Sequence, residues 1–327
     1  MANELQNKVF HDEAKARKWL EGHLWADGPV CSHCGTVNNA TAIEGRPGLY
    51  QCNESACRKQ FTVMTGTLFE RSHIPLNKWL MCAFLMCASK KGMSAHQMHR
   101  MLGISYKSAW FMCHRIREAM RDGTFPGPLG GEGKIVEADE TWIGGKEKNT
   151  HVGKLNKHNI GGAGKEPAFA LVERGGKGRS FHVPEVNSKT SRPILVAQVD
   201  RKSALMTDEG GQYYHVGKEF DRHETINHSA DEYVRGDAHT NTIEGYFSIL
   251  KRGIVGTYHH VSQQHLKRYL AEFDFRYNER SALGVDDKER AARLLKGIVG
   301  KRLTYRRPDE KRAGPANLHR AIGGVSA

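Results

Sequence analysis

Four of the seven cysteines stand in two short pairs near the N-terminus, and they constrain the fold more than any other feature. Two residues separate Cys31 from Cys34, four separate Cys52 from Cys57, and 17 lie between the pairs. Four thiolates brought together from two turns form the tetrahedral ligand set of a structural Zn²⁺. Turn-forming residues and short apolar runs between and after the pairs indicate a hairpin that closes on the metal. We therefore predict a zinc ribbon over residues 28–66.

The remaining cysteines are expected to be free thiols. Cys82, Cys87 and Cys113 lie in apolar segments with helical spacing, where buried thiols are common. An odd number of cysteines, with no apolar signal segment at the N-terminus, argues against a disulfide framework. His33 lies inside the first pair, but four thiolates already complete the ligand set. No apolar stretch approaches the roughly 20 residues that span a bilayer, so we expect a cytoplasmic protein without membrane contact.

The charge of the chain indicates a polyanionic partner. Its 327 residues carry a formal net charge of +13, and residues 245–327 hold 17 Lys+Arg against 8 Asp+Glu. Lys and Arg gain affinity for nucleic acid by releasing counterions from phosphates, so DNA is the expected partner. A basic surface that only keeps the protein in solution is the alternative. The length, with 39% hydrophobic residues, allows several domains with folded cores.

Residues 67–121 have the apolar spacing of helices. Ser94 and Ser105 are suited to cap two short helices, with a Leu-Gly-Ile turn between them. Two such helices joined by a glycine turn form a helix-turn-helix, a common DNA-binding unit. On that interpretation the residues near DNA are Tyr106, Lys107, Ser108 and Arg115. An ordinary helical hairpin inside a small bundle has the same spacing and remains the alternative.

A segment rich in glycine and proline separates this region from the second half. Residues 122–133 contain seven Gly or Pro in twelve positions, which indicates a linker. Apolar runs typical of strands then cover 135–142, 168–173, 180–186 and 203–207, and helical spacing covers 192–200, 242–252, 261–277 and 286–297. Strands followed by helices, with carboxylates at strand ends, favour an α/β domain of the RNase H-like kind. Residues 144–166, rich in Gly and Lys, are expected to form a loop available to DNA or simply exposed.

The expected protein is therefore of the α/β class, with its catalytic domain preceded by a zinc ribbon and a helical region. Six segments are expected along the chain. They are an N-terminal helix (1–27), the zinc ribbon (28–66), the helix-turn-helix-like region (67–121), the linker (122–133), the RNase H-like catalytic domain (134–297) and a basic, partly disordered tail (298–327).

Three acidic residues in the second half have neighbourhoods suited to a two-metal phosphoryl-transfer site. Asp139 lies in the strand-like IVEADETWIGG, and Asp208 ends the apolar run SALMTD. Glu244 lies in the helical HTNTIEGYFSILKRG, with Lys251 two turns later on the same face. Three carboxylates from separate elements can hold two divalent cations, which activate one oxygen of a phosphoryl transfer and stabilise the other.

Neighbouring residues compete for these assignments or assist them. Glu137 points to the same face of its strand as Asp139, because strand side chains alternate, so periodicity does not separate the two. Glu209 directly follows Asp208. Asn241 lies one helical turn before Glu244 and is available to assist it.

Taken together, these blocks resemble bacterial insertion-sequence transposases of the DDE type, specifically the ISXO-type group. The resemblance rests on ADETWIGG, on ALMTD, and on the segment from His239 through GTYHHVSQQHLKRYLAEFDFRYNER, and it extends over about residues 20–297. It implies that Asp139 and Asp208 hold a metal pair, with Glu244 completing the shell of one ion. It also implies Mg²⁺, replaceable by Mn²⁺, as the working ion. The residues that it places on the DNA backbone are Lys251 and Arg252.

The resemblance further implies a reaction. The enzyme would cut insertion-sequence ends at their terminal inverted repeats, and the freed 3′-OH would attack target DNA, with a homo-oligomer assembled on the DNA. Residues 1–121 would read the sequence of the ends, and residues 134–297 would contact phosphates. One alternative is a nuclease of the same fold that never joins strands. The other is a DNA-binding regulator derived from a transposase, which the three acids disfavour because a binder needs no metal carboxylates.

Overall fold

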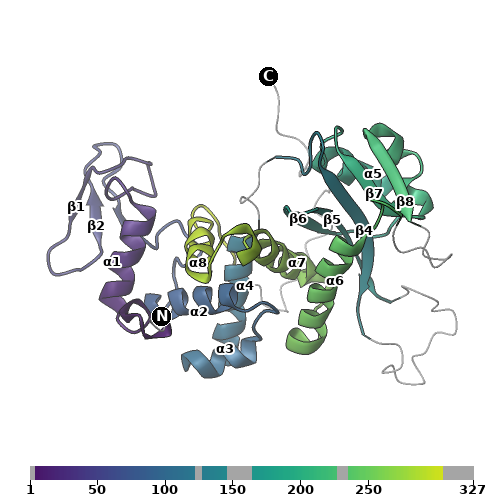
Figure 1. Ribbon diagram of the computed structural model, residues 1–327. Helices are drawn as coiled ribbons and strands as arrows, with labels where there is room; N and C mark the ends of the chain where they lie inside the picture. Colours follow the sequence, from purple (N-terminus) through teal and green to yellow (C-terminus); the bar gives the residue numbers. More distant parts are fainter. Residues whose placement is uncertain (1–3, 122–126, 146–163, 227–234, 305–327) are drawn as a thin grey trace, which may run out of the picture.

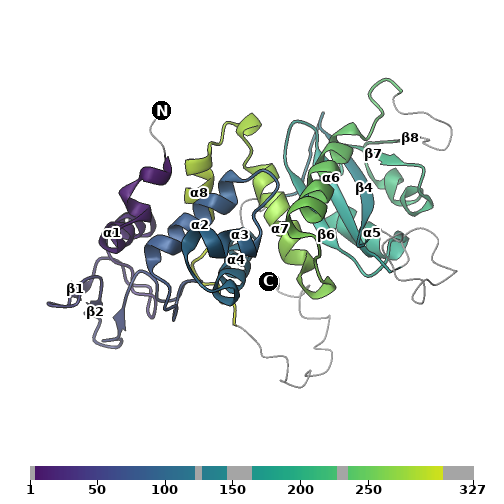
Figure 2. The same cartoon turned by 90° about the horizontal axis from the view of Figure 1, so that it is seen from below.

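The computed structural model describes residues 4–121, 127–145, 164–226 and 235–304. Three parts follow one another in a row, a small ribbon, a group of helices, and a mixed sheet with helices on both faces (Figures 1 and 2). Within the described ranges, no helix is long and apolar enough to cross a membrane.

The ribbon is a small antiparallel sheet preceded by a helix. Helix α1, Glu13–Leu24, begins after Asp12, whose carboxylate accepts a hydrogen bond from the N–H of Lys15. The strands are β1, Ala40–Ala42, β2, Tyr50–Cys52, and β3, Gln60–Phe61, in the order β1-β2-β3. Three aromatic rings, of Trp25, Tyr50 and Phe61, pack against one another with centroids 5.5–5.9 Å apart. This core is too small to hold the ribbon together without a further cross-link.

The helical part is built around α2, Leu76–Ala88, which is apolar on nearly all sides and therefore lies at the centre of the bundle. Helices α3, Ala95–Leu102, and α4, Tyr106–Met120, follow as predicted, each capped by the expected serine. Between them Gly103 has a positive φ of 59°, the left-handed conformation that ends a helix most easily at glycine.

A fourth helix in this bundle comes from the far end of the chain. Helix α8, Asp287–Lys296, places Ala291, Leu294 and Leu295 in the same apolar core as α2 and α4 (Figure 2). Backbone hydrogen bonds then tie residues 298–300 to residues 66–68. The expected catalytic domain, 134–297, therefore includes a helix that packs in the helical part instead of on the sheet. Residues 1–121 alone lack part of the core of the helical part.

The second half contains a five-stranded sheet. Its strands are β4, Ile135–Ile143, β5, Glu166–Glu173, β6, Gly178–His182, β7, Ala204–Asp208, and β8, Arg222–Ile226. Their order is β6-β5-β4-β7-β8. The first three pair in antiparallel fashion, while β7 and β8 run parallel to β4. Strand β5 is buried along almost its whole length, as expected for a strand covered on both faces.

Helices cover both faces of this sheet. Helix α5, Ser188–Gln198, packs with Val136, Ala138 and Leu205 on one face. Helices α6, Asn241–Gly253, and α7, Gln263–Asn278, pack with Ile143 and Val172 on the other. Helix α7 also contacts α4, so it joins the sheet domain to the helical part (Figure 1).

Several expectations from the sequence need correction. The described part of the expected linker belongs to the sheet domain, because Leu129 is buried and its backbone bonds to Gln198 and Asp200. Strand β8 was missed, since its RHETI sequence is polar at most positions of an edge strand. The predicted N-terminal helix is present as α1, but two 3-10 turns, Glu4–Gln6 and Lys8–Phe10, precede it. Most of the loop at 144–166 and of the tail at 298–327 lies outside the described residues.

Candidate active site and zinc centre

The four paired cysteines converge in the ribbon as predicted. Their sulfurs all lie within 4.8 Å of one another, with Cys31 Sγ 3.8 Å from Cys57 Sγ and Cys34 Sγ 3.6 Å from Cys52 Sγ. Four sulfurs bound to one zinc at about 2.3 Å lie roughly 3.8 Å apart, so the cluster has the dimensions of a closed tetrahedral site. No other group of His, Cys, Asp or Glu among the described residues is as compact. The cluster therefore supports Zn²⁺ as the ribbon's structural ion.

The surroundings of Cys34 favour its thiolate, and His33 points to another partner. A hydrogen bond with the Thr36 hydroxyl lowers the pKa of the Cys34 thiol to about 6, toward the ionised form that binds metal. His33 instead lies with Nε2 3.2 Å from the carbonyl of Gln60, on the neighbouring knuckle. The sequence-based choice of four cysteines without the histidine agrees with this geometry.

Two of the predicted acids lie at corresponding positions on adjacent parallel strands. Strands β4 and β7 pair with Glu137 opposite Met206. Two residues further along each strand come Asp139 and Asp208, which therefore lie side by side and on the same face of the sheet. Glu209, the alternative at the second position, is exposed beyond the end of β7.

The third acid comes from the helix that covers this face. Glu244 lies in the first turn of α6, which packs on β4. The hydroxyl of Thr240 donates to Glu244 Oε1 at 3.3 Å and helps to hold the side chain. Asn241 and Lys251 are exposed along the same helix, so the polar stripe predicted from the sequence is present. The structure thus brings carboxylates from β4, β7 and α6 to one place.

The electrostatics of Asp139 reflect these neighbours. The pKa of Asp139 is raised to about 7, mainly by burial, which is opposed by a hydrogen bond from the N–H of Glu140, and with contributions from the carboxylates of Glu140, Asp208 and Glu244. Oxygen donors concentrated in this way are the ligands that Mg²⁺ and Mn²⁺ prefer. Asp139, Asp208 and Glu244 therefore fit a divalent cation by donor chemistry, although they stand farther apart than the four thiolates do.

Glu137, the rival of Asp139, has a different role. Its carboxylate is completely buried, accepts a hydrogen bond from Arg174 Nε at 2.6 Å, and accepts another from the N–H of Ile243 at 2.9 Å. Ile243 lies in the first turn of α6, where N–H groups have no partner within the helix. Glu137 therefore caps the N-terminus of α6 from the sheet, and both of its carboxylate oxygens are already engaged in hydrogen bonds within the protein. Nothing in the sequence pattern separated this role from metal binding.

Glu140 faces away from the acids on the opposite side of β4. Its carboxylate accepts hydrogen bonds from the Tyr213 hydroxyl at 2.6 Å and from Gln212 Nε2 at 2.9 Å. These bonds fix the loop that follows β7 against the strand that carries Asp139.

The predicted DNA contacts differ in how the structure presents them. Lys107 is exposed at the start of α4, and Ser108 is half-buried, with its hydroxyl bonded to Ser105. Arg115 lies against the rings of Trp79 and Phe111 and donates to two backbone carbonyls. Arg115 therefore has an intramolecular role in this structure, and its contact with DNA stays a prediction.

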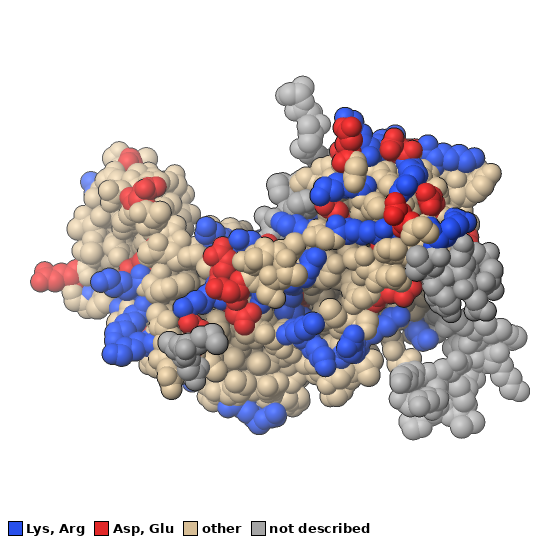
Figure 3. Space-filling view, viewed as in Figure 1, with Lys and Arg blue, Asp and Glu red and all other residues tan. Residues whose placement is uncertain are grey.

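The basic residues predicted near the end of α6 are exposed. Lys251 and Arg252 lie in the last turn of that helix, where Arg252 bonds to Ser248. In Figure 3, Lys and Arg side chains are spread over the helical part and the sheet domain, and few lie on the ribbon.

A network of buried charges joins α4 to α7, and sequence patterns did not reveal it. Arg117 Nε lies 2.6 Å from Glu272 Oε2, and both side chains are almost completely buried. Arg276 and the Tyr258 hydroxyl bond to the other oxygen of Glu272. The two arginines lower the pKa of Glu272 against the effect of burial.

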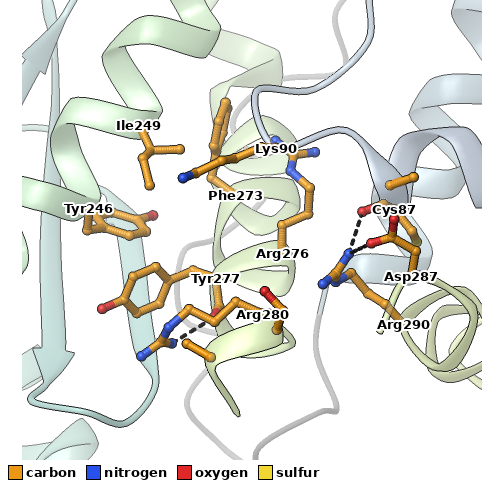
Figure 4. A pocket seen from close by; sticks show the side chains of 13 residues that line it. Cys87, Lys90, Tyr246, Ile249, Phe273, Arg276, Tyr277, Arg280, Asp287 and Arg290 are labelled. Carbon is orange, nitrogen blue, oxygen red and sulfur yellow. Dashed lines mark hydrogen bonds and ion pairs between the residues drawn. The ribbon is translucent and has the colours of Figure 1, made fainter. Parts of the chain in front are cut away.

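Nearby, a cavity of about 390 Å³ lies between α2, α6, α7 and α8, with Tyr246, Tyr277, Lys90 and Arg280 among its walls (Figure 4). It contains none of the three acids.

Two protein-family models match the regions that contain the three acids and the four paired cysteines. Residues 128–278 match the ISXO2-like transposase domain, and residues 11–60 match the transposase zinc-ribbon domain. These two segments therefore resemble a DDE transposase domain of the ISXO2-like type, preceded by a transposase zinc ribbon. The resemblance read from the three acidic blocks and the cysteine pairs is confirmed at this level.

Individual relatives add detail. A Halobacterium salinarum protein, described as an uncharacterized protein in transposable element ISH50, is 28% identical over 283 residues, covering 82% of this chain and 92% of the relative. That relative comes from an archaeon, so it does not support the expected restriction to bacteria. A crystal structure of a pre-cleavage Mos1 transpososome shares 14% identity and a TM-score of 0.26, covering 62% of this chain and 70% of that chain. A similarity this weak carries no argument about the fold.

The zinc centre yields a first prediction. Cys31→Ser should abolish zinc binding and unfold the ribbon, because the ribbon's aromatic core is too small to fold without the metal. Metal analysis of the purified protein, with circular dichroism of the same sample, measures both effects. Cys82→Ser is the matched control and should keep the ion, since Cys82 is buried in the helical core. Wild-type protein purified without zinc would contradict the assignment.

Glu137 and Asp139 on β4 should respond oppositely to substitution. Glu137→Ala should lower the free energy of unfolding by about 3–5 kcal/mol, because it leaves the partly buried guanidinium of Arg174 without its carboxylate and the N–H of Ile243 without an acceptor. Asp139→Asn should raise the melting temperature without added divalent cation, more at about pH 8 than at about pH 5. The pKa of Asp139 is higher in the folded than in the unfolded protein, so the folded protein loses stability as the pH rises from the unfolded pKa toward 7. Asn carries no charge at any of these pH values and avoids this loss. Thermal unfolding at both pH values measures this, and a destabilised Asp139→Asn would show that Asp139 is structural.

Proposed function

We propose that this protein is a DNA transposase that cuts the ends of an insertion sequence and joins them to target DNA by two-metal-ion phosphoryl transfer. We also propose that the mixed five-stranded sheet with helices on both faces is an RNase H-like catalytic domain. The observation that carries the proposal is the convergence of Asp139, Asp208 and Glu244 from β4, β7 and α6 within a region that matches a transposase domain.

The chain's own residues would divide the work of catalysis. Asp139 and Asp208 would hold a pair of Mg²⁺ or Mn²⁺ ions, and Glu244 would complete the shell of one. When bound, such ions supply an activated oxygen nucleophile and charge stabilisation for the leaving oxygen. Lys251, exposed farther along α6, would anchor a phosphate of the same DNA strand. Glu137 would act indirectly, because it positions α6 and with it Glu244.

DNA recognition would fall mainly to the helical part. The N-terminal turn of α4 exposes Lys107 and places Ser108 beside it, where a recognition helix contacts base edges. The ion pair between Arg117 and Glu272 would keep α4 in a fixed position relative to the catalytic domain. A homo-oligomer assembled on terminal inverted repeats would pair the two cuts, as the reaction requires two ends.

Cleavage and joining should both require the three acids and a divalent cation. Asp139→Ala, Asp208→Ala and Glu244→Ala should each reduce the rate of end cleavage by about 1000-fold or more, because several kcal/mol of charge stabilisation are lost. End binding should stay nearly unchanged. The assay is cleavage and strand transfer with labelled terminal-repeat DNA in Mg²⁺ or Mn²⁺.

Matched variants keep this test specific. Glu209→Gln, next to Asp208 but exposed, should retain activity, and Asn241→Ala shows whether that amide assists Glu244. Cleavage without any joined product would favour the simple nuclease. Binding without cleavage, in the presence of all three acids, would favour the regulator.

The two lysines should affect different quantities. Lys107→Ala should reduce the preference for terminal-repeat DNA over random DNA, since base contacts carry sequence information. Lys251→Ala should slow cleavage with little change in end affinity. Because residues 1–121 lack the core residues of α8, both variants are tested in the full chain, by competition binding and cleavage rate. If wild type and Lys107→Ala prefer terminal-repeat DNA over random DNA equally, α3 and α4 form an ordinary helical hairpin and do not read the DNA sequence.

A further inference from the structure

The loop after β7, which begins directly after Asp208, presents an aromatic ring to solvent. Tyr214 is 64% exposed, the highest value among the large hydrophobic side chains that the structure describes as exposed. The ammonium of Lys218 lies over its ring, 4.4 Å from the centroid, and the His215 ring meets it edge to face at 5.0 Å. An isolated exposed tyrosine is ordinary on a protein surface, so its meaning depends on where it lies and how it is held.

The loop that carries Tyr214 is held firmly against the catalytic strand. Its neighbour Tyr213 is completely buried, and its hydroxyl donates a hydrogen bond to the carboxylate of Glu140, the residue directly after Asp139. Gln212 bonds to the same carboxylate. At the start of the loop, the N–H of Gly210 donates to Asp208 Oδ1 at 3.0 Å. The exposed ring is therefore attached to both catalytic strands through neighbouring residues.

The space around the ring has a size and polarity suited to a nucleotide. A hollow of about 770 Å³ is lined by Glu209, three glycines, Tyr214, His215, Lys218 and His223. Aromatic faces bind unpaired bases regardless of sequence, and a lysine beside them binds the attached phosphate. A paired base cannot use such a face, because its own faces are already stacked in the duplex.

We propose that Tyr214 and Lys218 form a platform for one unpaired nucleotide of the DNA strand next to the scissile phosphate. The base stacks on Tyr214, and Lys218 contacts the adjoining phosphate. This inference rests on the proposed function, since it supposes that the three acids act on DNA.

The test uses the full chain without added divalent cation, so that binding is measured without cleavage. The probes are two short duplexes of equal sequence, one fully paired and one with a single unpaired 2-aminopurine in a gap. Wild type should quench 2-aminopurine fluorescence and prefer the gapped duplex. Tyr214→Ala should bind the gapped duplex about 10-fold more weakly and lose the quenching, while its affinity for the paired duplex stays unchanged. Tyr214→Phe should behave as wild type, because it keeps the ring.

Two further variants complete the design. Lys218→Ala should reduce the salt dependence of gapped-duplex binding by about one phosphate contact. Trp19→Ala removes another partly exposed aromatic, on α1, and should leave quenching unchanged. Equal gapped-duplex affinity in wild type and Tyr214→Ala would overturn the platform, whether or not the acids prove essential for cleavage. A change in sedimentation mass with unchanged gapped-duplex affinity would also overturn it and make Tyr214 a contact between copies.

Discussion

One buried carboxylate sets the geometry of the acidic site. Glu137 receives hydrogen bonds from Arg174 and from the first turn of α6, and Arg174 also donates to the carbonyls of Asp237 and His239, each at 2.8 Å. The segment that leads into α6 is thereby held against β4. Since Glu244 lies in that first turn, its position relative to Asp139 follows from this cluster. A buried charge is costly to desolvate, and here the cost is offset by one guanidinium and one helix N-terminus.

Most helices and strands and the zinc ligands could be predicted from the sequence, because both depend on local patterns. Cysteine spacing gave the ligands of the ribbon, and serine caps with a glycine turn gave α3 and α4. The three acids were predicted through strand-end position and resemblance together. These features need only neighbours in the chain, so the sequence displays them directly.

What could not be predicted depends on contacts between distant segments. The pairing of Glu137 with Arg174 spans 37 positions, and that of Arg117 with Glu272 spans 155. The packing of α8 in the helical core is of the same kind. Its amphipathic pattern shows that one face of the helix is buried, but it does not show which part of the protein covers that face. Strand β8 was missed for a related reason, since an edge strand with polar residues lacks the alternation that marks a half-buried strand. Tyr214 had no pattern at all, because exposure is a property of the folded loop.

Glu137 and Asp139 show how the same residue type acquires opposite functions two positions apart on one strand. Both lie on the face of β4 that α6 covers, yet Glu137 meets a cation and helix N–H groups, whereas Asp139 faces other carboxylates. The first arrangement leaves little affinity for a metal ion, since its oxygens already accept hydrogen bonds from fixed donors. The second leaves negative charge that a divalent cation would neutralise, and the raised pKa of Asp139 reflects its burial first and the repulsion from its neighbours second. Repulsion among the acids would by itself push α6 away from the sheet. The Glu137 cluster, acting beneath it on the same helix turn, supplies the opposing attraction, so the site can keep its acids together before any metal or DNA arrives.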